Sequence, residues 1–225
     1  MLDDRSTIQT KLSKGIERIF SEVDRMLAKQ QGTMNVYLSG ATLLLIFIVS
    51  DRVYCAWVGD SRALLVHELD HTLVFENLSE DHKPDQPEER RRILSQGGFI
   101  YPSRDYNNLP VGPNRIWNPQ AGGRPGPGLM MSRSLGDFLA KEVGVISVPT
   151  VFKKEIQSSM RFIVLASDGL WEVMDAKEVT SVVRDFISTK NPQEACQALM
   201  SCAQSKWRSS SPSYSDDISI IVIFF

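Results

Sequence analysis

Apolar side chains near the N-terminus recur at steps of three and four residues. Over residues 8–29 this spacing continues without a break, and it places the apolar positions on one face of an α-helix. Gly32 follows closely and is typical of a helix end. We therefore predict an amphipathic helix over residues 8–29.

Short apolar runs separated by tight polar turns fill the next part of the chain, residues 35–78. The runs are residues 41–49, 53–58, 63–66 and 73–75. Successive strands joined by tight turns are typical of an antiparallel meander. Because the runs are almost continuously apolar, we expect these strands to be buried on both faces.

A helix is predicted over residues 87–96, ended by Gly97 and Gly98. Asp85 is a candidate cap, with Glu88 three residues later as the second half of a capping box. The charged block at residues 88–92 is interpreted as a solvated helix face.

Two further helices carry start signals. Asp175 and Glu178 form a capping box that opens a helix to about residue 188, and Asn191-Pro192 starts another to about residue 206. Apolar runs at residues 161–166 and 218–225 predict strands.

Residues 101–128 are rich in Pro, Gly and Asn and lack periodicity. They predict a long irregular, flap-like loop, and such loops are often functional. We find no internal repeat and no domain boundary, so residues 1–225 are interpreted as a single domain.

Composition narrows the class of protein. The chain has 225 residues, 42% hydrophobic and 23% charged, with a formal net charge of −2. These values are typical of globular proteins, and the charge gives no reason to expect a nucleic-acid partner. The longest apolar run is about half of the ~20 residues that a membrane span needs, and the N-terminus does not look like a signal peptide. We expect a cytoplasmic or nuclear monomer that is not an integral membrane protein.

Three aspartates stand where apolar runs begin or end: Asp81, Asp168 and Asp216. Carboxylates at strand ends can meet at one rim of a sheet, and hard oxygen ligands suit Mg²⁺ or Mn²⁺. Aspartate is also an ordinary turn residue, so the residues alone leave both readings open.

Histidine, cysteine and serine offer less. His67 and His71 have a spacing that suits zinc on a helix, but they flank a turn between strands, and we expect two ordinary surface histidines. The odd count of three cysteines argues against a disulfide framework. No local pattern favours a Ser–His–acid hydrolase.

Six segments together resemble the ordered motifs of the type 2C, metal-dependent protein serine/threonine phosphatases. They are Ser39-Gly40-Ala41-Thr42, Val58-Gly59-Asp60-Ser61-Arg62-Ala63, Leu78-Ser79-Glu80-Asp81-His82-Lys83-Pro84, Gly128-Leu129-Met130-Met131-Ser132-Arg133-Ser134-Leu135-Gly136-Asp137, Leu165-Ala166-Ser167-Asp168-Gly169-Leu170-Trp171-Glu172 and Ser215-Asp216-Asp217-Ile218-Ser219. All six occur in the family's order.

The resemblance implies an α+β fold of two packed antiparallel sheets flanked by helices. It implies removal of phosphate from phosphoserine or phosphothreonine in protein substrates by a water that two Mg²⁺ or Mn²⁺ ions activate. A third ion binds in some members.

The resemblance also assigns roles to individual residues. Asp168 and Asp216 match metal ligands of the family, and Asp81 matches a ligand of the third ion. No catalytic residue is expected beyond these ligands. The remaining motif residues are expected to be structural: Asp60, Arg62, Arg133, Asp137 and Trp171.

One part of the family's pattern is not found in the chain. The family's Asp-Gly-His-Gly segment is absent, and Asp217 stands where an Asn is usual. We therefore expect an N-terminally incomplete domain with exposed edge strands and weak or no turnover. Two hypotheses follow: a fragment of an active phosphatase, or a pseudophosphatase that binds phosphoproteins or regulates other proteins.

Overall fold

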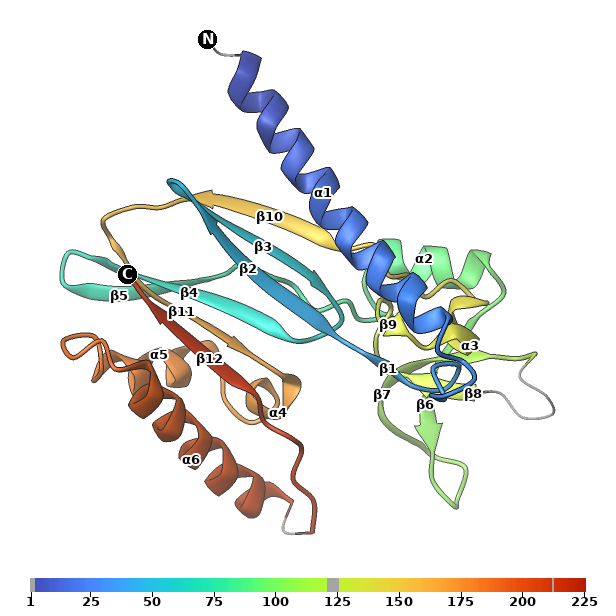
Figure 1. Cartoon of the computed structure of the whole chain (residues 1–225). Helices are drawn as coiled ribbons and strands as arrows, with labels where there is room; N and C mark the ends of the chain where they lie inside the picture. Colours follow the sequence, from blue (N-terminus) through green and yellow to red (C-terminus); the bar gives the residue numbers. More distant parts are fainter. Residues whose placement is uncertain (1–2, 121–125, 212) are drawn as a thin grey trace. The chain divides into compact units, whose positions relative to one another are not determined.

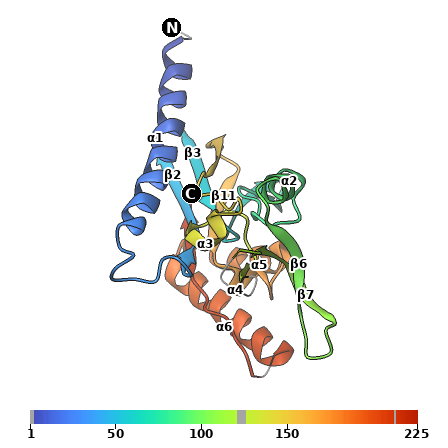
Figure 2. The same ribbon diagram turned by 90° about the vertical axis from the view of Figure 1, so that its right-hand side faces the viewer.

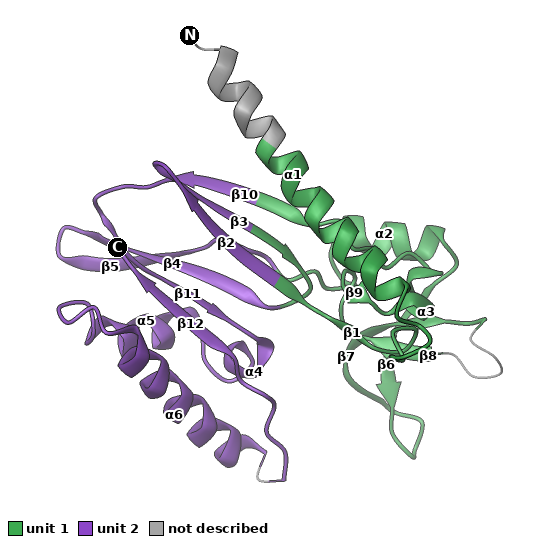
Figure 3. Cartoon of the chain, in the orientation of Figure 1, with its two compact units in different colours: residues 1–43, 56–60, 81–151 green, residues 44–55, 61–80, 152–225 purple. Residues whose placement is uncertain are grey.

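The computed structural model describes residues 3–120, 126–211 and 213–225, and for residues 3–11 it describes the backbone alone. Residue contacts divide the chain into two compact units (Figure 3). Unit 1 comprises residues 1–43, 56–60 and 81–151, and unit 2 comprises residues 44–55, 61–80 and 152–225. Each unit is described by itself, and the prediction of a single domain stays a prediction.

Unit 1 contains an antiparallel sheet with strand order β6-β7-β8, and Figure 2 shows β6 and β7 side by side. A small apolar cluster on this sheet includes Ile93, Ile116 and Val143. The elements of the unit (Figure 1) are α1 (Asp3–Ala28), β1 (Gly40–Ala41), α2 (Pro87–Ser95), β6 (Phe99–Arg104), β7 (Pro110–Asn118), β8 (Gly126–Leu129), β9 (Leu135–Gly136) and α3 (Phe138–Lys141). The long N-terminal helix is therefore confirmed.

The flap-like segment is not an irregular loop, so that part of the prediction is wrong. Most of residues 101–128 belongs to β6, β7 and β8, while residues 121–125 lie outside the described part. The sequence did not indicate these strands because it is rich in proline, and Pro interrupts a strand's hydrogen bonds. A long-range contact stabilises them instead: the Trp117 indole stacks on Tyr101 at 5.2 Å between ring centroids and donates to the Tyr101 carbonyl oxygen at 2.9 Å.

Unit 2 is built on an antiparallel sheet with strand order β12-β11-β4-β5. Helices α5 and α6 pack on it through an apolar cluster that includes Phe162, Val183 and Leu199. The elements are β4 (Arg62–Leu69), β5 (Thr72–Asn77), β11 (Met160–Ala166), α4 (Asp168–Trp171), α5 (Ala176–Arg184), α6 (Pro192–Ser210) and β12 (Ile220–Phe224). Helices together with antiparallel sheets confirm the predicted α+β class.

A further sheet has strand order β10-β3-β2. Its strands are β2 (Leu43–Val49), β3 (Arg52–Val58) and β10 (Thr150–Glu155). Burial on both faces is confirmed for β3, whose residues from Val53 to Val58 are all buried. The same prediction is wrong for β2, an edge strand of seven apolar residues of which none is buried.

Helix starts were predicted well where the capping residues lie close in sequence. The Asp175 side chain accepts a hydrogen bond from the Glu178 backbone N–H at 2.8 Å, and the Glu178 side chain accepts one from the Asp175 backbone N–H at 3.1 Å. At α6 the Asn191 side chain accepts a hydrogen bond from the Glu194 backbone N–H. The capping box at Asp85 is wrong, because the N-cap of α2 is Gln86, which makes no side-chain cap bond.

His67 is buried, so the prediction of a surface histidine is wrong there, whereas His71 is exposed. The His67 Nε2–H donates to Glu76 Oε1 at 2.8 Å, and the His67 Nδ1 lies 3.2 Å from Ser159 Oγ. Ser159 is far away in the sequence, so no local pattern could indicate this contact.

Among the described residues, no helix combines the length and apolar character that a membrane span requires.

Unit 1 contains a buried carboxylate at Glu89, which is only 2% exposed. Arg92 donates to both of its oxygens at 2.9 and 2.7 Å, Arg133 donates at 2.7 Å, and Ser132 Oγ donates at 2.5 Å. Burial alone would raise the pKa of Glu89, but the hydrogen bonds from Arg92, Arg133 and Ser132 outweigh it and hold that pKa well below its ordinary range. The solvated face predicted for residues 88–92 is therefore wrong at Glu89.

We predict that Glu89→Gln lowers the free energy of unfolding by about 3–5 kcal/mol, because it removes one partner of a buried ion pair. Urea unfolding followed by circular dichroism measures the change. Glu88→Gln, at the exposed neighbour, is the matched control and should change stability by less than about 0.5 kcal/mol. Equal effects of the two variants would contradict the assigned role.

The same group predicts a dependence of stability on pH. A carboxyl group whose folded pKa is depressed stabilises the fold above its unfolded pKa, near 4.5, and that contribution is lost as the pH falls below it. The wild-type chain should therefore lose more stability between pH 5 and about pH 3 than Glu89→Gln does. Parallel pH profiles for the two proteins would refute the prediction.

Candidate functional site

Asp168 follows directly on the end of strand β11, where the sheet gives way to the short helix α4. Antiparallel pairing of β11 with β12 places Ala166 opposite Ile220. The ladder continues one step further, because Ser167 N–H donates to the Ser219 carbonyl at 3.1 Å. Asp168 Oδ1 accepts a hydrogen bond from the Gly169 N–H at 3.0 Å, which orients the half-buried carboxylate.

Asp216 lies in the loop that leads into β12, at the same end of the β11–β12 pair. Its Oδ1 accepts from the Asp217 N–H at 2.8 Å. The two loops touch, since Ser167 Oγ donates to the Asp217 carbonyl at 3.2 Å. A Cβ at Gly169 would stand 2.4 Å from that same carbonyl oxygen. Asp168 and Asp216 are thus brought together by the register of two strands.

The pKa of Tyr214 is affected by the negative charges at this end of the sheet. The negative charge of Asp216 is the main cause that raises the pKa of Tyr214 above its ordinary value. The charges of Glu172 and Asp168 act in the same direction. Three carboxylates therefore lie within electrostatic range of one phenol.

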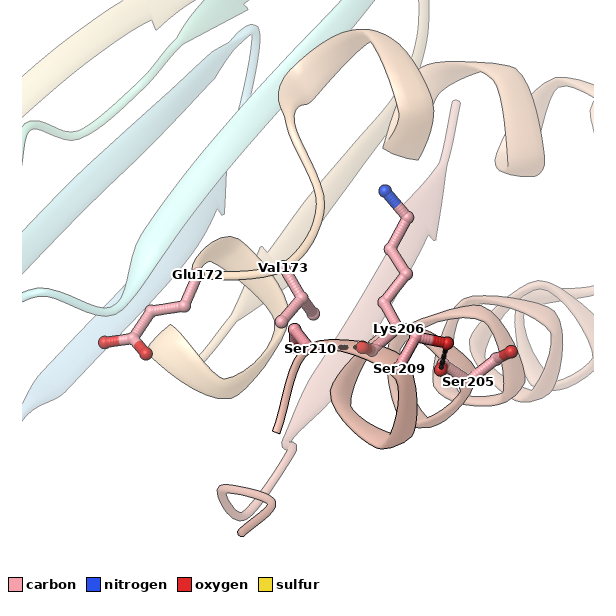
Figure 4. A pocket seen from close by; sticks show the side chains of 6 residues that line it. All are labelled: Glu172, Val173, Ser205, Lys206, Ser209 and Ser210. Carbon is pink, nitrogen blue, oxygen red and sulfur yellow. Dashed lines mark hydrogen bonds between the residues drawn. The ribbon is translucent and has the colours of Figure 1, made fainter. Parts of the chain in front are cut away.

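A cavity of about 490 Å³ lies beside Glu172, between α4 and the last turns of α6 (Figure 4). It is lined by Glu172, Val173, Ser205, Lys206, Ser209 and Ser210. The Lys206 ammonium is paired with Glu178 of α5. Ser209 and Ser210 donate to the carbonyls of Ser205 and Lys206, each at 3.0 Å.

Asp81 belongs to unit 1 and is half-buried. Its backbone carbonyl accepts from Gln86 Nε2 at 2.7 Å and from the Lys83 N–H at 2.9 Å. The next residue, His82, is buried, accepts from the Gly59 N–H at 3.2 Å and stacks on Trp57. Burial is the main cause that lowers the pKa of His82, to about 4. The role of Asp81 as a third ligand stays a prediction.

No group of three or more His, Cys, Asp or Glu side chains that could hold a metal ion occurs in the part of the chain that the structure describes. Asp168 and Asp216 nevertheless supply hard oxygen donors of the type that Mg²⁺ and Mn²⁺ prefer. The donor set therefore fits such an ion chemically.

Several other motif residues make structural contacts. Asp60 is buried and pairs with Lys83. Arg133 holds Glu89. The Trp171 indole donates to the carbonyls of Arg62 and Ala166 at 3.2 and 3.0 Å.

Sequence reasoning missed Tyr214 and Trp207 at this site. The Trp207 indole donates to the Gly169 carbonyl at 2.7 Å, and its ring meets that of Tyr214 edge-on. An aromatic residue in a Ser-rich helix end was the only available signal.

Comparison with known proteins gives the family. The sequence model described as Protein phosphatase 2C matches residues 2–211. The chain is 38% identical over 190 residues to probable protein phosphatase 2C 73 of Arabidopsis thaliana, covering 84% of this chain and 48% of that protein. It is 36% identical over 189 residues to probable protein phosphatase 2C 34 of the same plant, covering 83% and 50%.

A solved structure agrees with the sequence relatives. The serine-threonine phosphatase 2C from Toxoplasma gondii matches with a TM-score of 0.82 and 26% identity, over 95% of this chain and 67% of that one. The chain spans about half the length of the curated relatives named above. Since the family model covers nearly all of its residues, the chain belongs to the protein phosphatase 2C family.

Proposed function

We propose that this chain is part of a metal-dependent protein serine/threonine phosphatase, in which Asp168 and Asp216 each give a carboxylate oxygen to Mg²⁺ or Mn²⁺. One observation carries the proposal: the β11–β12 register brings two acidic loops to the same end of the sheet. Family membership supplies the reaction class, which is hydrolysis of phosphoserine and phosphothreonine in proteins.

Divalent ions, when bound, would lower the pKa of water and neutralise negative charge on the phosphoryl oxygens. The chain's own residues orient the two carboxylates. The N–H groups of Gly169 and Asp217 each fix one carboxylate oxygen. A two-ion centre is part of this proposal, with Asp81 as a ligand of a third ion.

A pseudophosphatase that binds phosphoproteins or regulates other proteins is the alternative. The observation that favours it is that the described residues contain two neighbouring carboxylates but no group of three metal-binding side chains. A site with few ligands holds an ion weakly, so binding and turnover have to be measured separately.

We predict that the chain binds Mn²⁺ and that Asp168→Asn weakens the binding at least about 10-fold, because it removes a charged ligand. Electron paramagnetic resonance of free Mn²⁺ measures the affinity. The matched control is Asp185→Asn, at an exposed residue that follows α5, and it should bind as the wild type does. Equal affinities of all three proteins would remove Asp168 from the site.

Phosphate release from a phosphothreonine peptide, with Mn²⁺ or with chelator, separates the two functions. Chelator-sensitive turnover that Asp168→Asn abolishes supports the phosphatase. Binding of the peptide by a folded chain that shows no turnover, with or without Mn²⁺, supports the pseudophosphatase.

We also predict that Gly169→Ala destabilises the chain by about 1–3 kcal/mol, as overpacking does, because its Cβ would meet the Asp217 carbonyl at 2.4 Å. The variant should weaken Mn²⁺ binding as well, since the Asp216 loop has to move. Gly32→Ala is the control, since nothing lies within 4 Å of a Cβ there. A Gly169→Ala chain with wild-type stability would contradict the close approach of the two loops.

A further inference from the structure

Trp207 lies in the last turn of α6 and is 6% exposed. Its indole N–H donates to the Gly169 carbonyl at 2.7 Å in a buried hydrogen bond. Its ring meets Tyr214 edge-on, with 5.7 Å between ring centroids and an interplanar angle of 81°. One side chain thus contacts two segments that are remote from each other in sequence.

Each of these two contacts joins Trp207 to a segment that carries a candidate metal ligand. Gly169 is the residue after Asp168, and its N–H holds the Asp168 carboxylate. Tyr214 lies two residues before Asp216, in the loop that leads into β12. Trp207 is therefore the side chain through which α6 reaches both acidic loops.

The packing of α6 on the sheet does not account for Trp207. The helix is anchored in the apolar cluster of unit 2 by Ala195, Leu199 and Ala203. Trp207 is outside that cluster, one turn further along. Its own position is fixed by the end of the helix, where its carbonyl accepts the Ser211 N–H at 2.8 Å and the preceding Lys206 pairs with Glu178.

We infer that Trp207 is a positioning residue, which holds the Asp168 and Asp216 loops at the separation that a divalent cation requires. This inference rests on the proposed function of the two aspartates. The indole N–H fixes the Asp168–Gly169 peptide from one side. The ring packs edge-on with Tyr214 and so restrains the loop that carries Asp216.

Partners that orient a metal ligand typically change metal affinity by about 10- to 100-fold when they are removed. Trp207→Phe keeps an aromatic ring and loses the N–H donor. We expect it to weaken Mn²⁺ binding by the 225-residue chain about 10-fold. Amide hydrogen exchange at Asp217 and Ser219, whose N–H groups are bonded inside the two loops, should become faster without any metal present.

The matched control is Trp117→Phe. Trp117 also donates its indole N–H to a backbone carbonyl and stacks on a tyrosine, but it does so within unit 1. It should leave Mn²⁺ affinity and exchange at the two loops unchanged. Urea unfolding of both variants separates a loss of global stability from a local effect.

Tyr214→Phe is the second variant, and the exposure of Tyr214 makes misfolding of little concern. It keeps the edge-on ring and loses the hydroxyl, the group whose pKa the charge of Asp216 raises. If Trp207 acts through Tyr214, the two substitutions together should weaken Mn²⁺ binding by less than the product of their separate effects.

Two outcomes would overturn the inference. One is a Trp207→Phe chain with wild-type Mn²⁺ affinity and wild-type exchange at Asp217 and Ser219, even if its urea midpoint falls. The other is an equal effect of Trp117→Phe. If the wild-type chain binds no Mn²⁺ at all, the proposed function fails, and the exchange rates measured without metal still decide the role of Trp207.

Discussion

The antiparallel pairing of β11 with β12 is the interaction on which the candidate site depends. Their register runs from Phe162 opposite Phe224 to Ala166 opposite Ile220, and the two phenylalanines meet edge-on at 5.9 Å. A slip of one residue would turn the apolar side chains of β12 to the other face of the sheet. The register fixes where the two acidic loops leave the sheet.

The interiors of the two units are stabilised by different interactions. Unit 2 packs long helices on its sheet through an extended apolar cluster. Unit 1 has a smaller cluster and gathers its loops around the carboxylate of Glu89. Arg92, which Glu89 holds, also donates to the backbone carbonyls of Gly144 and Ser132, at 2.8 and 3.0 Å. Buried charge of this kind ties loops to one arrangement, because each lost partner leaves another group unsatisfied.

The sequence predicted features whose partners are close along the chain. The caps at Asp175 and Asn191 act over three residues, and both were found. The burial of Glu89 could not be predicted, because Ser132 lies 43 positions away, and the strands of the flap-like segment depend on pairing that its prolines obscure. At the site, a family motif identified Asp168 and Asp216. Trp207 went unnoticed because a lone aromatic residue at a helix end has no distinctive pattern.

Two neighbouring carboxylates repel each other when no cation lies between them, so their separation needs support from the protein. The N–H groups of Gly169 and Asp217 set the orientation of each carboxylate, but each acts inside its own loop. Ser167 joins the two loops by hydrogen bonds to Asp217 and Ser219, but Tyr214 is 58% exposed and by itself is a weak restraint. A buried side chain that is bonded to one loop and packed against the other restrains both loops at once, which the local bonds do not. The geometry of the pair therefore depends on α6, through Trp207, as well as on the strands that carry the aspartates.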